Sequence, residues 1–181
     1  MVFPSSHPLT SNPFKNTVNI LPKLVKNIET PMTSDQKWDR RFLELAKHIS
    51  SWSKDTTKIG AVIAEAGPSR DVVSIGYNGF PRGFQDTGER FENRVEKYKY
   101  TVHAEMNAIF TAAREGKYLN DTTLYVYGLP VCHECAKGVI QAGIKRVIVN
   151  TMDAPEQWMA STMKAAEFFK EAKVEYRKIN I

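Results

Sequence analysis

The residues best able to do chemistry are His103, Glu105, Cys132 and Cys135. The chain has 2 cysteines in its 181 residues, and they stand three positions apart as C-H-E-C. One imidazole and two thiolates can hold Zn²⁺ through three protein ligands, which leaves the fourth tetrahedral position for water. Zinc lowers the pKa of such a water towards neutrality, so that a hydroxide nucleophile exists at working pH. Glu105, two positions after His103, is placed to carry the protons.

The two cysteines also allow plainer interpretations. A lone C-x-x-C occurs in redox pairs of thioredoxin type and as half of a structural zinc site. A structural site usually has four protein ligands, but no third cysteine exists, and His133 is expected to point away from its neighbours on a helix face. A redox pair does not need the H-x-E. We therefore favour a catalytic zinc site.

The composition indicates a globular chain. Apolar residues make up 42% and charged residues 25%, which is an ordinary balance. We expect no membrane span, because no apolar run of about eighteen residues occurs, and no secretory signal. Two cysteines acting as metal ligands indicate a reducing compartment, hence the cytoplasm. The net charge of +5 suits an anionic substrate but is too weak to argue for nucleic-acid binding.

The pattern along the chain predicts an arm and one domain. Residues 1–31 contain scattered prolines and no sustained period, so we expect a partly ordered arm, followed by a domain over residues 32–181. A capping box of Thr33 and Gln36 opens the first helix. Periodicity predicts further helices from His103 to Gly116, over Cys132–Ala142, and from near Asp153, with Glu156 in the capping position, to about Ala172. Strands are predicted over Ile59–Ala64, Val72–Tyr77, Thr122–Tyr127, Arg146–Asn150 and Val174–Lys178.

This order predicts an α/β fold with three α-β-α layers. The first two strands form an antiparallel hairpin, and the later β-α-β units require parallel strands. The result is a mixed five-stranded sheet with helices on both faces. The zinc ligands then lie at the amino ends of two helices, where the helix dipole stabilises thiolates. Residues 84–102 show little periodicity and many charges; we expect an irregular functional segment there.

An H-x-E followed by a proline and a C-x-x-C is the signature of zinc-dependent nucleobase deaminases. The chain resembles the cytidine deaminase superfamily, and within it the deoxycytidylate (dCMP) deaminase family, over roughly residues 38–179. The segments that carry this resemblance are Gly60–Ile63, Gly76–Gly83, His103–Ile109, Cys132–Lys137 and Gln141–Lys145. It implies a cytidine deaminase-like fold and hydrolysis of dCMP to dUMP and ammonia, which supplies dUMP for thymidylate synthesis.

The resemblance also implies roles for single residues. His103, Cys132 and Cys135 would bind one Zn²⁺, and Glu105 would shuttle protons between water, the ring N3 and the leaving ammonia. Substrate contacts would come from Asn78 at the sugar, from Ser53 and Lys54 near the phosphate, and from Ala104 and Pro130. Family members are commonly hexamers that dCTP activates and dTTP inhibits, with Mg²⁺ accompanying the nucleotide. The allosteric or interface candidates are Gly79, Arg82, Gly83 and Arg114.

The sequence departs from the family at two places, and other functions stay open. Val131 stands between Pro130 and Cys132, where the family usually has none, and no aromatic residue follows the strand ending at Asn150 unless Trp158 takes that place. A modified dCMP, or a base in tRNA or single-stranded DNA, is an alternative substrate, although the mixed charges of residues 84–102 do not favour a nucleic acid. A non-catalytic zinc module is a third interpretation, but it would not need Glu105. Asn78 could serve only as a turn residue, and Lys54 and Arg82 as solvated charges.

Overall fold

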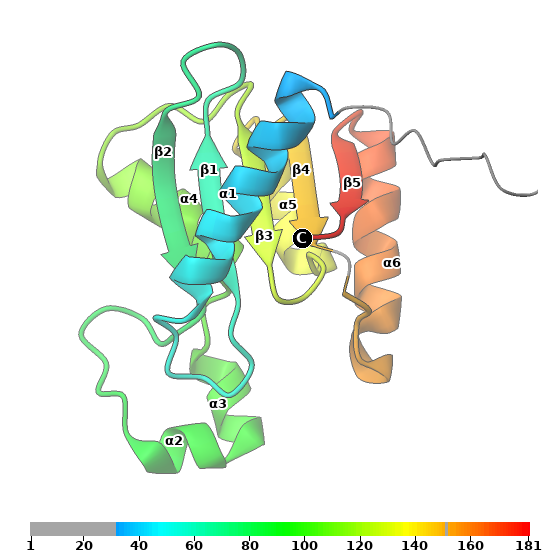
Figure 1. Ribbon diagram of the computed structural model, residues 1–181. Coiled ribbons are helices and arrows are strands. Elements are labelled where there is room, and N and C mark those ends of the chain that lie inside the picture. Colours follow the sequence, from blue (N-terminus) through cyan, green and yellow to red (C-terminus); the bar gives the residue numbers. More distant parts are fainter. Residues whose placement is uncertain (1–31, 151) are drawn as a thin grey trace, which may run out of the picture. The chain divides into compact units, whose positions relative to one another are not determined.

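A mixed five-stranded sheet with the strand order β2-β1-β3-β4-β5 forms the centre of the fold. The computed structural model describes residues 32–150 and 152–181 (Figure 1); the expected arm of residues 1–31 lies outside them. The strands are β1 (Gly60–Ala64), β2 (Val72–Tyr77), β3 (Thr123–Tyr127), β4 (Arg146–Asn150) and β5 (Glu175–Ile179). The helices of the described residues are α1 (Ser34–Ser50), α2 (Gly88–Glu92), α3 (Arg94–Tyr100), α4 (Ala104–Arg114), α5 (His133–Gln141) and α6 (Glu156–Glu171).

The strand directions follow from the connections between them. β1 is antiparallel to β2 and β3, whereas β3, β4 and β5 are parallel to one another. A short turn joins β1 to β2, as an antiparallel hairpin allows, and α5 and α6 supply the crossovers that parallel strands require. The predicted mixed five-stranded sheet is confirmed.

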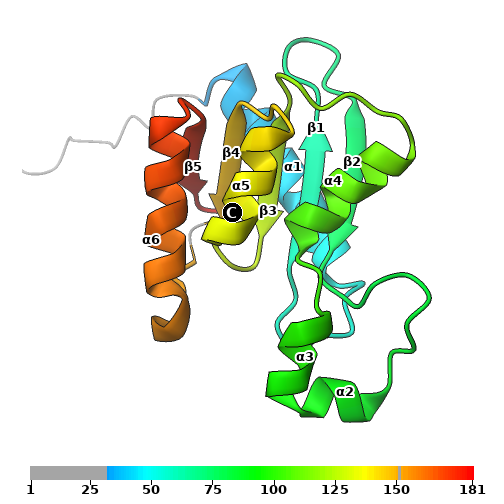
Figure 2. The ribbon, with the colours of Figure 1, turned by 180° about the vertical axis from the view of Figure 1, so that it is seen from behind.

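Helices cover both faces of the sheet, as predicted. α1 lies across one face (Figure 1), where Phe42, Leu43 and Ala46 pack against strand residues. α4, α5 and α6 lie on the opposite face (Figure 2) and contribute residues such as Val139 and Phe169 to a second apolar cluster. Because β1, β3 and β4 are buried almost throughout, they are apolar runs without an alternating pattern.

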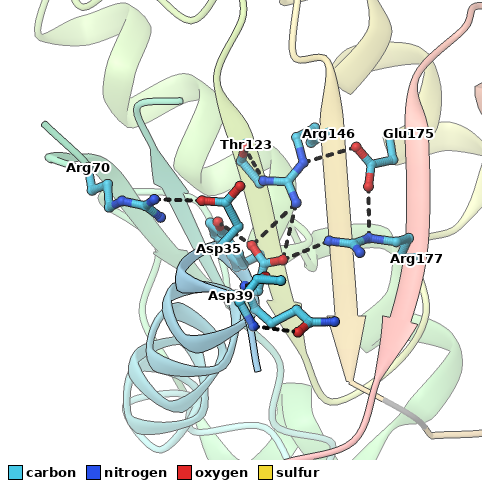
Figure 3. Close-up of polar contacts among 10 residues, drawn as sticks. Asp35, Asp39, Arg70, Thr123, Arg146, Glu175 and Arg177 are labelled. Atoms are coloured by element: carbon cyan, nitrogen blue, oxygen red, sulfur yellow. Dashed lines mark hydrogen bonds and ion pairs between the residues drawn. The ribbon is translucent and has the colours of Figure 1, made fainter. Parts of the chain in front are cut away.

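An ion-pair network around one buried carboxylate fastens α1 to the sheet (Figure 3). The Asp39 carboxylate of α1 accepts hydrogen bonds from the Tyr125 hydroxyl at 2.9 Å, from Arg146 at 3.1 Å and from Arg177 at 2.7 Å. These partners lie on β3, β4 and β5. One carboxylate therefore joins the first helix to three strands, including the last element of the chain.

Two sequence predictions are wrong. The last helix begins at Glu156, not near Asp153, because Pro155 takes the N-cap position in extended geometry, with no side-chain hydrogen bond capping the helix. Residues 84–102, expected to be irregular, contain α2 and α3. These helices were missed because α2 buries no residue and α3 buries only Lys97, so neither has the apolar stripe on which such predictions depend.

The remaining elements agree with the predictions to within one or two residues. The capping box is present, since the Thr33 hydroxyl accepts from Gln36 N–H and the Gln36 side chain accepts from Thr33 N–H. Throughout the part of the chain that the structure describes, every helix is too short or too polar to cross a lipid bilayer.

Candidate active site

The three candidate zinc ligands lie at the amino ends of α4 and α5. His103 is the N-cap of α4, Cys132 is the N-cap of α5, and Cys135 lies in the first turn of α5. The His103 Nδ1 lies 3.4 Å from Cys132 Sγ and 3.3 Å from Cys135 Sγ. Tetrahedral zinc, with bonds of about 2.0–2.3 Å, holds its ligand atoms about 3.5 Å apart. The donor set and its spacing therefore fit Zn²⁺.

Hydrogen bonds within this cluster favour a thiolate. The pKa of Cys132 is lowered to about 4, mainly by a hydrogen bond from the Cys135 thiol and further by His103. The bond to Cys132 raises the pKa of His103 to about 9, although burial acts in the opposite direction. The Cys135 backbone N–H also points at the Cys132 sulfur, at 3.4 Å. Zinc binds thiolates and neutral imidazole, so the metal would take the place of these shared protons.

Glu105 is the buried acid of the site. Its side chain projects from the first turn of α4 with only 3% of the residue exposed, and burial is the main reason that its pKa is raised, partly offset by the charge of His103. Its Oε2 is buried and has no hydrogen-bond partner among the residues described. A buried carboxyl with a free oxygen, beside a metal-ligand cluster, is suited to transfer protons.

A cavity of about 130 Å³ opens beside the cluster. The residues that line it include His103, Glu105 and Cys132, and also Tyr98 of α3 and Trp158 of α6. The rings of these two residues meet edge to face, with centroids 5.7 Å apart. Trp158 is the aromatic residue that, on the sequence, could take the place usually filled soon after β4. The structure shows that Trp158 does line the cavity.

Asn78 lines the same cavity, but its amide also holds the loop before β1. Its Oδ1 accepts from the Ile59 N–H and its Nδ2 donates to the Thr57 carbonyl, both at 2.8 Å. Asn78 does not have a positive φ angle. The left-handed turn conformation that asparagine tolerates is therefore not the reason for an asparagine at this position. One N–H and one lone pair of the amide stay free for a ligand, and a sugar contact remains a prediction.

The other predicted substrate residues are divided between the cavity and its surroundings. Pro130 lines the cavity, whereas Ala104 is fully buried in the apolar cluster. Ser53 is buried and donates its hydroxyl to the Asn78 carbonyl at 2.7 Å. The Lys54 side chain is 68% exposed and pairs with Asp86 at 2.9 Å. Ser53, Lys54 and Ala104 are therefore not brought to the cavity wall.

Val131, the additional residue before Cys132, is fully buried in the apolar cluster. Its side chain packs inward and is not part of the cavity wall. The fold accommodates this extra residue by burying it.

Sequence reasoning missed the charged wall of the cavity. Lys97 of α3 and Asp55 form an ion pair of 2.9 Å, with side chains only 9% and 4% exposed, and both line the cavity beside Arg94. The two partners are 42 positions apart, and no local pattern marks them. They become visible only when the segment of residues 84–102 is folded.

The allosteric or interface candidates gather elsewhere. Gly79, Arg82 and Gly83 of the loop after β2, together with Arg114 near the end of α4, line a second cavity. The Gly79–Val102 bridge lies at the base of that loop, and Asn107 of α4 donates to the Tyr77 carbonyl at 2.8 Å. This cavity shares no lining residue with the one beside the candidate zinc ligands.

The mixed sheet, the His/Cys/Cys cluster and the adjacent buried glutamate together define the class of zinc-dependent nucleobase deaminases. The sequence model of the family described as the cytidine and deoxycytidylate deaminase zinc-binding region matches residues 33–151. The chain belongs to this family. The resemblance found in the sequence motifs, and the prediction of an enzyme of this kind, are confirmed.

Individual relatives agree with this assignment. An uncharacterized deaminase of the luxG 3′ region of Aliivibrio fischeri is 37% identical over 142 residues, which cover 77% of this chain and 91% of the relative. A probable deoxycytidylate deaminase of Caenorhabditis elegans is 40% identical over 134 residues, 72% of this chain and 64% of the relative. The chain thus spans less than two thirds of the nematode protein.

A solved structure shows the same fold. The dCMP deaminase of the cyanophage S-TIM5, in complex with dCMP and dUMP, superimposes with a TM-score of 0.63 at 23% identity. The match covers 82% of this chain and 99% of the cyanophage chain. At this identity the likeness concerns the fold.

Proposed function

We propose that this protein hydrolyses dCMP to dUMP and ammonia. The observation that carries the proposal is Glu105, a buried carboxyl with a free oxygen that lines a cavity next to three residues that fit Zn²⁺. The names of the nematode relative and of the cyanophage structure support dCMP as the substrate.

His103, Cys132 and Cys135 would hold the metal ion, and Zn²⁺, when bound, supplies a Lewis acid that makes water nucleophilic near neutral pH. Glu105 accepts a proton from the attacking water and donates it to N3 of the cytosine ring as the water oxygen bonds to C4. Glu105 then passes the second proton to the amino group, the C4–N bond breaks, and ammonia leaves. Trp158, Tyr98 and Pro130 flank the cavity and would limit the access of bulk water.

The proposal extends to regulation, assembly and location. The shared cavity of Gly79, Arg82, Gly83 and Arg114 supports a regulatory nucleotide site that takes dCTP or dTTP with Mg²⁺. A hexamer follows from the family resemblance. A cytoplasmic location follows from ligand thiols that must stay reduced.

The test is ammonia release from dCMP, deoxycytidine and CMP in parallel, each with and without dCTP plus Mg²⁺. We expect turnover of dCMP alone, increased by dCTP. Activity on none of these monomers by zinc-loaded protein would contradict the proposal and favour a modified nucleotide or a polynucleotide base. Turnover without any response to dCTP would contradict only the regulatory part.

A further inference from the structure

One face of α3 lines the active-site cavity. Arg94, Lys97, Tyr98 and Thr101 all border it, and their spacing of three, four and seven positions places them on one side of a helix. α3 belongs to the charged segment in which the sequence showed no structure. The two cations on this face differ in what they contact.

Lys97 is already neutralised. Its ammonium lies 2.9 Å from Asp55 and both side chains are nearly inaccessible, while Asp55 also accepts from the Thr57 N–H at 3.0 Å. A buried lysine that is paired in this way holds α3 against the loop before β1. It does not offer a free positive charge to a ligand.

Arg94 is different, because no ion pair found within residues 32–150 and 152–181 includes it. Its Nε donates to the Tyr98 hydroxyl at 2.7 Å, and its guanidinium lies 5.6 Å from the centre of the Tyr98 ring. The Tyr98 ring in turn contacts the ring of Trp158, which also lines the cavity. These contacts orient the arginine through one N–H and leave the terminal N–H groups available, which suits a bidentate oxyanion such as phosphate.

The position of Arg94 along α3 fits the length of a nucleotide. Thr101, at the carboxyl end of α3, is two residues from the ligand His103, and Arg94 lies seven residues earlier, about 10 Å along a helix axis. A nucleoside 5′-monophosphate carries its amino group and its phosphate at opposite ends. With the base at Glu105, the charged end of the substrate would reach the Arg94 end of the cavity.

From this geometry we infer that Arg94 binds the 5′-phosphate of the substrate and is the residue that distinguishes the nucleotide from the nucleoside. This inference rests on the proposed function. It differs from the sequence prediction of a phosphate contact by Lys54, whose ammonium pairs with Asp86 outside the cavity wall.

The experiment measures kcat and KM of the zinc-loaded, full-length protein for dCMP and for deoxycytidine. Arg94→Gln should lower kcat/KM for dCMP about 10- to 100-fold, mostly through KM, because a charge-assisted contact made equally in ground and transition states is lost. The residual rate with deoxycytidine should stay unchanged. Arg94→Lys should recover part of the loss, since it restores the charge without the planar fork.

Lys99→Gln is the matched control, because Lys99 lies on α3, is exposed and pairs with Glu96 away from the cavity; it should behave as wild type. The inference about Arg94 would be overturned if Arg94→Gln lowered kcat/KM equally for both substrates. It would also be overturned if Lys54→Gln lowered kcat/KM for dCMP and Arg94→Gln did not. In either case, turnover of dCMP by the wild type would still support the proposed function. Absence of dCMP turnover in the wild type would overturn both.

Discussion

At the scale of single residues, the proposed chemistry depends on a carboxyl held out of water. Glu105 is nearly inaccessible, and its raised pKa, caused first by burial, keeps a proton on it more readily than on a surface glutamate. Glu105 is not one of the three residues of the candidate metal-binding cluster, which are His103, Cys132 and Cys135. Proton transfer and metal binding are therefore separable by substitution.

Glu105→Gln should abolish most turnover and preserve zinc. The amide keeps the size of the side chain but cannot move a proton, and general acid–base groups contribute about 10²- to 10⁴-fold in rate. Ammonia release and zinc content measured on the same sample test this. Glu134→Gln is the control. Glu134 lies next to Cys135 in the sequence, but its side chain is exposed to solvent and pairs with Lys137. A Glu105→Gln protein with full deaminase rate would show that another group carries the protons.

The candidate metal ligands could be predicted from the sequence because each pair of motif residues is local. Cys132 and Cys135 are one helical turn apart, and His103 and Glu105 lie at the start of one helix, so spacing alone places the members of each pair together. That the two pairs meet was implied by the family resemblance, not by the spacing. The substrate wall could not be predicted in this way. Whether Lys54 or Arg94 meets the cavity depends on how the loop before β1 contacts a segment some forty positions later, as Asp55 and Lys97 do, and no local pattern encodes that contact.

At the scale of elements, the position of α4 depends on its close approach to β2. A Cβ added at Gly76 would lie 2.3 Å from the Ala104 carbonyl oxygen and 2.4 Å from the Ala108 nitrogen. Both are backbone atoms of the helix that presents His103 and Glu105. Ser74 strengthens the same contact by donating to the Ala108 carbonyl at 2.7 Å.

Gly76→Ala should therefore damage stability and the site together. Backbone atoms cannot rotate away, so the helix must shift, and overpacking of this kind costs about 1–3 kcal/mol or more. Urea unfolding should show the loss, and zinc retained after dialysis should fall because His103 moves. Gly88→Ala is the control, since the nearest atom to its added Cβ is a flexible glutamate oxygen at 3.9 Å. Normal zinc retention in Gly76→Ala would mean that β2 does not position α4.

Elements were predictable where apolar residues recur. β2 and β4 agree with the predicted bounds, because both are short runs rich in β-branched residues between turn residues. α3 was not predictable, because its contribution is a buried lysine and a face of polar residues. α3 lines the cavity, and it is held in place by the long-range ion pair between Lys97 and Asp55. Its structure therefore depends on tertiary contacts that no local pattern shows.

At the scale of the whole described domain, stability and chemistry use opposite faces of the sheet. The candidate zinc ligands lie at the amino ends of α4 and α5. Asp39 lies on α1 across the sheet, where it joins β3, β4 and β5 (Figure 3). Asp39 is 2% exposed, and the Arg146 and Arg177 side chains are 27% and 40% exposed. Both arginines also form ion pairs with Glu175. If Asp39 lost its charge, Glu175 would still balance part of their positive charge.

Asp39→Asn should accordingly lower the free energy of unfolding by about 2 kcal/mol, less than the 3–5 kcal/mol expected for a fully buried pair, because water reaches the arginines. Urea unfolding with an unchanged m-value would measure it. Asp35→Asn, one turn earlier on α1, is the matched control. Asp35 pairs with Arg70 and its side chain is 74% exposed, so its removal should change stability little. Zinc content and kcat of folded Asp39→Asn should match wild type, because the network lies on the other face of the sheet from the ligands. If the two variants unfolded at the same urea concentration, the network would not be what fastens α1 to the far strands.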